Sequence, residues 1–406
     1  MNEILLGSLV IIGLVMALTV GLLAARRRLV PQGAVEVVVN DTRHIAAARG
    51  ETLLSVLHGA GIGIPAGCGG NGTCGLCRVT ATGEGAGLPQ ATEMGVLSAG
   101  ERRANVRLAC QTVLRGSAQV TVPGDVLAAE TFDCKVLSNR MLAPLIREFV
   151  LELPEGRAFD FRAGGFGQLT APPYALDFSR FDVPEPFRET WTINRWDRLT
   201  AQSSKPVTRA YSIANRPEDA GRIVFNIRLA VPPAGHEGEI PPGAVSSYIF
   251  SLKPGDTIGC SGPFGEFHVQ PTAKEMVFIG GGVGMAPLRA MIHEQIGKGT
   301  DRKMSYFYGA RTAADLFYVE EFDAIAAAHP NFTWTPALSD PAPGDRWTGE
   351  TGFIHEIVRA RLSRHPAPED CEYYLCGPPV MISAVFAMLD RLGVERSAIF
   401  NDDFGI

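Results

Sequence analysis

The chain has 406 residues, with 37 Lys and Arg against 43 Asp and Glu, and a formal net charge of −6. Hydrophobic residues at 46% and charged residues at 20% are typical of folded protein, so extended disorder is disfavoured. The acidic balance gives no field that attracts phosphate backbones, which excludes nucleic acid as a main partner, and eight cysteines are too few for a disulfide-built fold of this length.

The first predicted element is an uncharged apolar segment over residues 4–25. As a helix rising 1.5 Å per residue, it is long enough to cross a hydrocarbon core of about 30 Å. Arg26, Arg27 and Arg28 follow at once, and such basic flanks stay in the cytoplasm. A cleaved signal peptide is the alternative, but it needs a basic stretch before a shorter apolar one. We therefore expect a single-pass anchor over residues 1–30, with everything after it in the cytoplasm.

Residues 31–128 are predicted to form a small α+β domain. Residues 34–39 and 119–123 read as strands, and a short helix is expected over 52–58. Between them lies a glycine-rich loop that carries three of the eight cysteines.

The spacing of four cysteines indicates a metal centre. Cys68, Cys74 and Cys77 are separated by five and then two residues, and Cys110 follows further along. Four thiolates hold the two irons of a [2Fe–2S] cluster, and glycines let the backbone point N–H groups at the sulfurs. Zinc is the alternative, although its four-cysteine sites usually present two separated CxxC pairs. The loop resembles that of β-grasp ferredoxins, with five rather than four residues between the first two cysteines.

Residues 129–268 are predicted to form a domain rich in strands, punctuated by turn residues. The expected strands are 133–138, 146–153, 166–170, 209–214 and 222–229. Residues 172–207, which contain Trp191 and Trp196, interrupt this domain. Such a long excursion is either a docking surface or a locally packed flap.

Two motifs of this domain suggest a flavin site. Arg209, Tyr211 and Ser212 belong to the strand RAYS, and GAVSSY opens a helix where N–H groups near Ser246 and Ser247 form an anion site. The motifs resemble the flavin-binding signatures of the ferredoxin–NADP reductase superfamily. By that resemblance Arg209 neutralises the FAD pyrophosphate, Tyr211 packs on the isoalloxazine, and Ser212 lies near the nitrogen that takes hydride. A surface arginine beside a core tyrosine is the alternative for RAYS alone.

From residue 275 strands and helices alternate, which predicts a parallel sheet within residues 269–406. A glycine-rich turn links the first strand to its helix: Gly280, Gly281, Gly282, Val283, Gly284, Met285, Ala286 and Pro287. A later strand ends in Cys376, Gly377 and Pro378. Ends of parallel strands meet at one edge, so the two segments predict a dinucleotide crevice. In the superfamily these segments hold the nicotinamide over the flavin, which makes Cys376 an active-site thiol.

The remaining candidates lie around this crevice. Tyr308 and Arg311 are expected near the adenosine half, and the poor phosphate site at 312–315 favours NADH over NADPH. The superfamily commonly places a C-terminal aromatic against the flavin, which makes Phe404 a candidate shield; an unstructured tail is the alternative. The other cysteines, Cys134, Cys260 and Cys371, are expected to be small core residues.

The cofactor types set the order of electron transfer. NADH delivers two electrons as hydride, a [2Fe–2S] cluster accepts one at a time, and FAD divides the pair. The order NADH, FAD, cluster follows.

The whole chain resembles the F subunits of sodium-translocating NADH:quinone reductases. The agreement covers the N-terminal segment, the cysteine loop, RAYS, GAVSSY, GGGVGMAP, YYLCGPP and the DDF tail, in order. The resemblance implies a multidomain fold: one transmembrane helix, a β-grasp ferredoxin domain, an antiparallel β-barrel FAD domain and an α/β parallel-sheet NADH domain. It also implies an NADH-oxidising subunit in the bacterial inner membrane that passes electrons to partner subunits A to E and on to ubiquinone, with the sodium path in those partners.

Two other functions compete with this one. The reductase component of a multicomponent monooxygenase has the same three cofactor domains, but such reductases lack residues 4–25 and 172–207. A scaffold subunit that does not turn over is disfavoured by the intact GGGVGMAP and CGPP segments.

Overall fold

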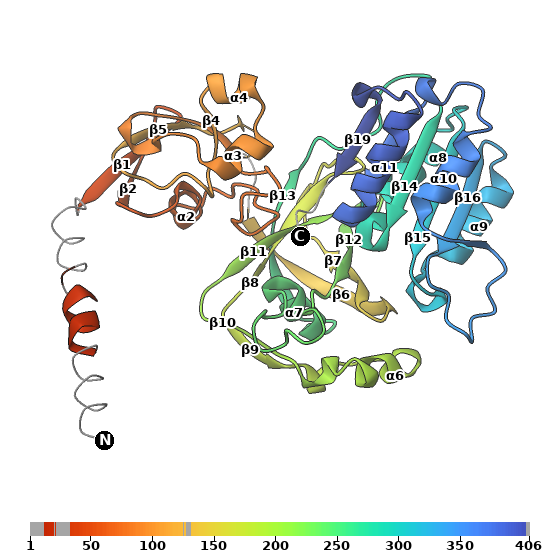
Figure 1. Cartoon of the computed structure of the whole chain (residues 1–406), viewed down its shortest axis with the longest axis horizontal. Helices are drawn as coiled ribbons and strands as arrows, with labels where there is room; N and C mark the ends of the chain where they lie inside the picture. Colours follow the sequence, from red (N-terminus) through yellow and green to blue (C-terminus); the bar gives the residue numbers. More distant parts are fainter. Residues whose placement is uncertain (1–11, 20, 22–32, 125, 127–130, 403–406) are drawn as a thin grey trace. The chain divides into compact units, whose positions relative to one another are not determined.

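The computed structural model describes residues 12–19, 21, 33–124, 126 and 131–402 (Figure 1). The chain divides into two units: unit 1 comprises Met1–Ile64 and Cys77–Pro123, and unit 2 comprises Pro65–Leu76 and Gly124–Ile406. Most of the apolar segment at 4–25, the arginines at 26–28, and Phe404 lie outside the described residues. Among the residues that are described, no helix has the length and apolar character needed to cross a membrane.

Unit 1 is built on a mixed five-stranded sheet in the order β2-β1-β5-β3-β4, in which only β1 and β5 pair in parallel. Its strands are β1 (Ala34–Val39), β2 (Arg43–Ala48), β3 (Arg78–Thr82), β4 (Val106–Leu108) and β5 (Ala118–Thr121). Val35, Val37 and Val39 of β1 are buried in alternation, as expected for a strand with one face on a core. The strands predicted at 34–39 and near 119–123 are confirmed.

Short helices cover and cap this sheet: η1 (Glu84–Ala86), α2 (Leu53–Gly59), α3 (Ala91–Val96) and α4 (Ala99–Arg103). Helix α2 begins after Thr52, whose hydroxyl accepts the Ser55 N–H at 3.3 Å, and it confirms the predicted helix. A buried ion pair between Arg107 and Glu93, at 2.8 Å, ties α3 to β4. The same guanidinium bonds the carbonyls of the segment after η1. This pair therefore fixes the chain three residues before Cys110.

Six antiparallel strands of unit 2 form the barrel half of that unit, in the order β11-β8-β13-β6-β7-β12. They are β6 (Thr131–Ala143), β7 (Ile146–Glu152), β8 (Phe166–Ala171), β11 (Val207–Ser212), β12 (Arg222–Arg228) and β13 (Thr257–Phe264). A bridge between Ile213 and Phe225 brings the two outermost strands together and closes the barrel. Helix α7 (Ala244–Ser251) packs on the barrel core, where Cys134 and Cys260 are fully buried, as predicted.

The excursion over residues 172–207 folds into an arm that packs on the barrel. It contains β9 (Tyr174–Asp177), η2 (Phe178–Arg180), α6 (Glu185–Ile193), η3 (Trp196–Arg198) and β10 (Thr200–Ser203), with β9 and β10 paired antiparallel. Trp191 is buried in the barrel core, and its indole N–H donates to the Pro144 carbonyl at 2.6 Å. Trp196 packs edge-on against Trp191. The tryptophans therefore favour the packed flap over the docking surface.

The parallel-sheet half of unit 2 has strand order β17-β16-β15-β14-β18-β19, with every neighbouring pair parallel. The strands are β14 (Met276–Gly281), β15 (Met304–Ala310), β16 (Phe332–Leu338), β17 (Glu350–Thr351), β18 (Glu372–Cys376) and β19 (Ile399–Asp402). The predicted alternation of strand and helix is confirmed. The chain passes from β14 to β15 on one side, while β18 lies on the other side of β14. Ligands of open parallel sheets bind outside such a switch point.

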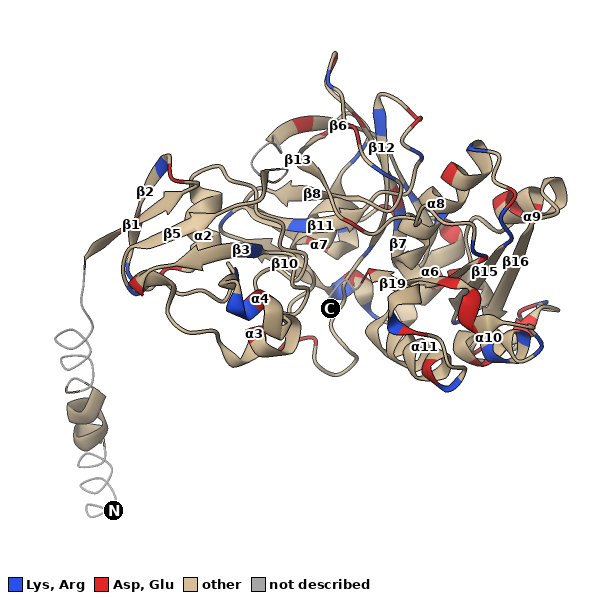
Figure 2. Ribbon diagram, turned by 90° about the horizontal axis from the view of Figure 1, so that it is seen from above, with Lys and Arg blue, Asp and Glu red and all other residues tan. Residues whose placement is uncertain are grey.

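Helices cover both faces of this sheet (Figure 1). Helices α8 (Met285–Gly297) and α9 (Val319–Ala328) pack with Phe278 of β14, whereas α10 (Ile354–Leu362) and α11 (Pro379–Arg391) pack with Val277 and Ile279. Short turns complete the half: η4 (Gly282–Gly284), η5 (Ala313–Asp315), η6 (Pro368–Asp370) and η7 (Arg396–Ala398). Figure 2 shows acidic and basic residues together on α10, which is typical of a solvated helix face.

Candidate active site

The cysteines of the predicted cluster site lie at the ends of strands and on the glycine-rich loop. Within unit 2, the backbone N–H of Cys68 donates to Sγ of Cys74 at 3.4 Å. Within unit 1, Cys77 directly precedes β3 and Cys110 follows β4, and the Ala109 N–H donates to the Cys77 carbonyl at 2.8 Å.

The loop has the local chemistry that an iron–sulfur cluster requires. Four of its glycines have φ between 66° and 100°, a region that favours glycine: Gly69, Gly70, Gly72 and Gly75. A backbone N–H already points at a cysteine sulfur, as in the outer hydrogen bonds of such clusters. No disulfide links the eight cysteines, all of which are described. The donor set and backbone therefore fit a [2Fe–2S] group.

The RAYS residues lie on β11, where Tyr211 pairs with Gly167 and Ser212 with Phe166 of β8. Burial raises the pKa of Tyr211, whose ring packs against the barrel core. Arg209 is half-buried, and its Nη1 donates to the Thr208 carbonyl at 2.8 Å. The strand thus presents a cation, an aromatic ring and a hydroxyl in sequence.

The start of α7, next in the chain, is where the sequence predicts an anion site. The cap residue Gly243 offers no side chain to the helix, and Ser246 accepts the Ala230 N–H at 3.3 Å. The hydroxyl oxygen of Ser247 is buried and has no hydrogen-bond partner. An orphaned hydroxyl in the first turn of a helix fits a phosphate group, because N–H groups there also lack intrahelical partners.

The glycine turn and the CGP segment meet at the carboxyl edge of the parallel sheet. Gly280 of β14 pairs with Cys376 of β18. A Cβ on Gly284 would collide with the Cys376 carbonyl and approach the Gly377 nitrogen to 2.7 Å. Gly282 has φ of +56° and open space around it. The two segments predicted to form one crevice are therefore in contact, and only glycine fits between them.

The other predicted residues of this crevice differ in exposure. Pro287 and Cys376 are buried, the latter in the core that α8 covers. Tyr308 is fully buried within β15, and its hydroxyl donates to the Gly282 carbonyl at 2.9 Å. Its side chain therefore holds the glycine turn through this hydrogen bond. Arg311 is exposed and bonds Asp340 through Nε and Nη2 at 3.1 and 3.0 Å.

A hydrogen bond between Ser212 and Asp402 joins the two halves of unit 2 beside the CGP segment. The Ser212 hydroxyl donates to Oδ2 of Asp402 at 3.0 Å, and Asp402 on β19 pairs with Cys376. The RAYS strand therefore reaches the end of the strand that carries the CGP segment. Sequence reasoning missed Asp402, although it stands two residues before the selected Phe404 in the same tail.

Phe353 is a second residue that sequence reasoning missed. Its side chain is 64% exposed just before α10, and it stacks with His355 at 6.0 Å between ring centroids. The neighbouring Ile354 packs against Gly309 of β15. An exposed aromatic ring therefore stands at the carboxyl edge beside the segment expected to meet adenosine. The signal in the sequence was an aromatic residue directly after a glycine.

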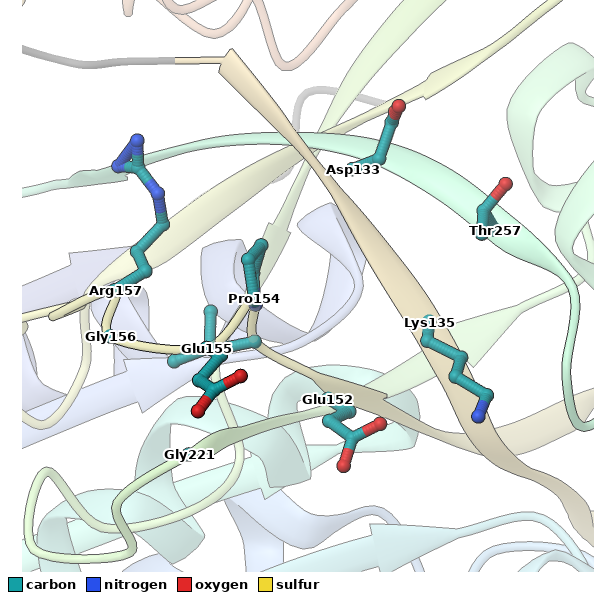
Figure 3. A pocket seen from close by; sticks show the side chains of 10 residues that line it. Asp133, Lys135, Glu152, Pro154, Glu155, Gly156, Arg157, Gly221 and Thr257 are labelled. Carbon is teal, nitrogen blue, oxygen red and sulfur yellow. The ribbon is translucent and has the colours of Figure 1, made fainter.

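A hollow of about 610 Å³ lies elsewhere on the barrel half (Figure 3). Its lining comes from β6, β7, β13 and the turn after β7, and includes Lys135, Glu152, Glu155 and Arg157. Charges of both signs line it, and none of the residues selected from the sequence does.

Comparisons with known proteins agree with this organisation. The chain matches three family models: a 2Fe-2S iron-sulfur cluster binding domain at residues 37–115, an oxidoreductase FAD-binding domain at 196–269, and an oxidoreductase NAD-binding domain at 278–386. Among solved structures it resembles the Amycolatopsis cytochrome P450 reductase GcoB, with a TM-score of 0.61 and 26% identity over 91% of this chain and 98% of that one. The ferredoxin reductase in carbazole 1,9a-dioxygenase, at 24% identity and a TM-score of 0.60, covers 92% of this chain and 99% of its own and shares the fold.

Full-length relatives settle the family. The F subunit of the Na(+)-translocating NADH-quinone reductase of Methylococcus capsulatus is 47% identical over 407 residues, covering 100% of both chains. The protein of the same name in Idiomarina loihiensis is 46% identical, again over 100% of both chains. The chain therefore belongs to the family of the F subunits of Na(+)-translocating NADH-quinone reductases.

Proposed function

We propose that this chain is the electron-input subunit of a sodium-translocating NADH:quinone reductase. It takes hydride from NADH at the crevice of the parallel-sheet half and sends electrons through the cysteine loop to partner subunits and ubiquinone. The observation that carries the proposal is the Ser212–Asp402 hydrogen bond of 3.0 Å, because Asp402 pairs with Cys376. That bond supports a flavin site beside the proposed nicotinamide crevice.

The residues divide the work of binding and orientation. Arg209 and the first turn of α7, with Ser246 and Ser247, hold the pyrophosphate of FAD, and Tyr211 and Ser212 line its ring. The turn from Gly280 to Gly284 and the segment from Cys376 to Pro378 hold the nicotinamide. When bound, FAD supplies the step from two-electron to one-electron transfer, and the cluster on Cys68, Cys74, Cys77 and Cys110 carries single electrons. Asp402 accepts the hydrogen bond that the Ser212 hydroxyl donates and thereby fixes that hydroxyl's direction.

NADH is the proposed donor rather than NADPH. Arg311, which the sequence predicts near the adenosine half, is already paired with the Asp340 carboxylate. A 2′-phosphate at that position meets a negative charge, which disfavours its binding.

The proposal keeps the domain boundaries expected from the sequence: anchor 1–30, cluster domain 31–128, FAD domain 129–268 with the insertion 172–207, and NADH domain 269–406. It also includes a single-pass anchor over residues 4–25 in the bacterial inner membrane, cytoplasmic cofactor domains, partner subunits A to E, and sodium transport by the complex. The names of the full-length relatives and the apolar character of residues 4–25 support these parts.

Anaerobic mixing of the purified full chain with NADH tests the central claim. The flavin absorbance is expected to bleach with NADH much faster than with NADPH. An unchanged flavin band overturns the enzyme assignment and supports a scaffold subunit instead.

Deletion of residues 1–30 within the complex tests the membrane assignment. An artificial acceptor is expected to be reduced at the original rate while quinone reduction in membranes is lost. Equal retention of both activities contradicts the assignment and favours a soluble reductase.

A further inference from the structure

Arg289 links three elements around the crevice through one side chain. It lies on α8, five residues after Gly284, which corresponds to about 7.5 Å along the helix. Its Nη1 donates to the Ala214 carbonyl at 2.8 Å, and Ala214 stands two residues after Ser212. Its Nε and Nη2 donate to the Glu321 carboxylate of α9 at 2.7 and 2.9 Å. One guanidinium thus joins the helix of the glycine turn to the chain just beyond the RAYS strand.

A second link runs beside it through Tyr318. The ring of Tyr318 lies 4.5 Å from the Arg289 guanidinium carbon. Its hydroxyl donates to Glu148 of β7 at 2.6 Å and accepts from the Asn226 amide of β12 at 2.9 Å. Tyr318 also has φ of +58°, a conformation that costs a non-glycine residue free energy unless its surroundings hold it. Both links therefore connect the parallel-sheet half to the barrel half.

The chemistry of this junction requires arginine. The Arg289 and Glu321 side chains are only 17% and 28% exposed, so their two-bond pairing is partly shielded from water. Burial raises the pKa of Glu321, but hydrogen bonds from His293 and Arg289 and the charge on Arg289 lower it to about 2, which keeps the carboxylate ionised. Lysine has a single point charge and cannot make three bonds in one plane.

We propose that Arg289 is a positioning residue for hydride transfer, which fixes the distance between the glycine turn and Ser212 by bonding α8 to the Ala214 carbonyl. This inference rests on the proposed function, since the transfer takes place between groups held by those two segments. Hydride transfer requires reacting atoms about 3–3.5 Å apart, and a displacement of about 1 Å costs roughly 100-fold in rate. A junction that ties both segments within a few residues of the crevice limits such displacement.

The test uses the full chain carrying FAD and its cluster, as wild type and as Arg289→Gln, Arg289→Lys and Lys298→Gln. Lys298→Gln is the matched control, because it removes the pair of the exposed Lys298 side chain with Glu294 at the end of the same helix. Anaerobic rapid mixing gives the limiting rate of flavin bleaching and the apparent Kd for NADH. Arg289→Gln is expected to lower the limiting rate about 10- to 100-fold with Kd and FAD content little changed. Arg289→Lys recovers only a small part of the rate, and Lys298→Gln matches wild type.

Hydrogen–deuterium exchange supplies a readout besides activity. Amides around Ala214 are expected to exchange faster in Arg289→Gln than in wild type or Lys298→Gln. An unchanged limiting rate in Arg289→Gln, or full recovery by Arg289→Lys, overturns the proposal. If Arg289→Gln loses FAD or fails to fold, Glu321→Gln decides: a slower limiting rate supports the positioning role and an unchanged rate rejects it. Absence of bleaching in wild type instead rejects the proposed function, so the two failures are distinguished.

Discussion

The two halves of unit 2 build their parts of the crevice in opposite ways. In the proposed site, the barrel half contributes side chains, namely the cation, ring and hydroxyls of β11 and α7. The parallel-sheet half contributes close backbone contact, because Gly284 leaves no room for a Cβ against the Cys376 carbonyl. A site built from side chains loses individual interactions when it is mutated, whereas a site built from backbone contact is disrupted by any added atom.

The largest effect is expected from adding one carbon to the parallel-sheet half. A methyl group at Gly284 collides with the Cys376 carbonyl, so Gly284→Ala forces the glycine turn and the CGP segment apart. We expect the rate of flavin reduction by NADH to fall about 100-fold or more, because a shift of about 1 Å costs that much. FAD content, measured by absorbance, should stay at the wild-type level.

Gly297→Ala is the control on the same helix, since a Cβ there meets only the end of the Arg216 side chain at 4.0 Å. Wild-type rates are expected for it. A Gly284→Ala protein that reduces its flavin normally would show that close backbone contact is not what shapes this part of the crevice.

In the barrel half, removal of one charge is expected to weaken FAD binding without abolishing it. Arg209→Gln loses a charge-assisted hydrogen bond to phosphate, and we expect FAD Kd to rise roughly 10- to 100-fold. Titration of flavin fluorescence measures the change. Arg222→Gln, at the exposed start of β12, is the control and should bind FAD as wild type does. Equal FAD Kd values for the two variants would show that Arg209 does not bind the pyrophosphate.

The same contrast explains how much the sequence could predict. The glycine turn, the CGP segment and the cysteine loop were recognisable because close backbone approach demands glycine at fixed spacing. The strands β14 and β18 were recognisable as buried apolar runs that end in those motifs.

Elements held by distant contacts were missed. β13 contains two glycines and a proline, which read locally as turns. β19 has only four residues and becomes a strand by pairing with β18, so Asp402 could not be placed beside Ser212. The fold of the arm over residues 172–207 likewise depends on the burial of Trp191 in the barrel. Long-range pairing and packing of this kind are not encoded in local patterns.

A smaller effect is expected where the two halves touch. Asp402→Ala leaves the Ser212 hydroxyl without its acceptor, and the limiting rate of flavin reduction should fall about 10-fold because that hydroxyl is no longer oriented. Asp402→Asn keeps an acceptor oxygen and should retain most of the rate. The double variant Ser212→Ala, Asp402→Ala should be no slower than the slower single variant, since both changes break one interaction. Additive losses in stopped-flow measurements would contradict a shared role.

The smallest effect is expected at the outer end of the proposed crevice. There the parallel-sheet half contributes a side chain, and not the close backbone contact that it contributes at Gly284. Phe353 is 64% exposed at the carboxyl edge of the sheet. Its ring therefore offers a flat apolar surface on which adenine can stack. We expect Phe353→Ala to raise the KM for NADH about 5-fold with kcat unchanged, because stacking is lost equally from the ground and transition states. Phe353→Tyr keeps the ring and should behave as wild type in steady-state assays with an artificial acceptor. A fall in kcat would instead mean that the Phe353 ring influences the position of the nicotinamide. In that case side chains of the parallel-sheet half would contribute along the whole crevice.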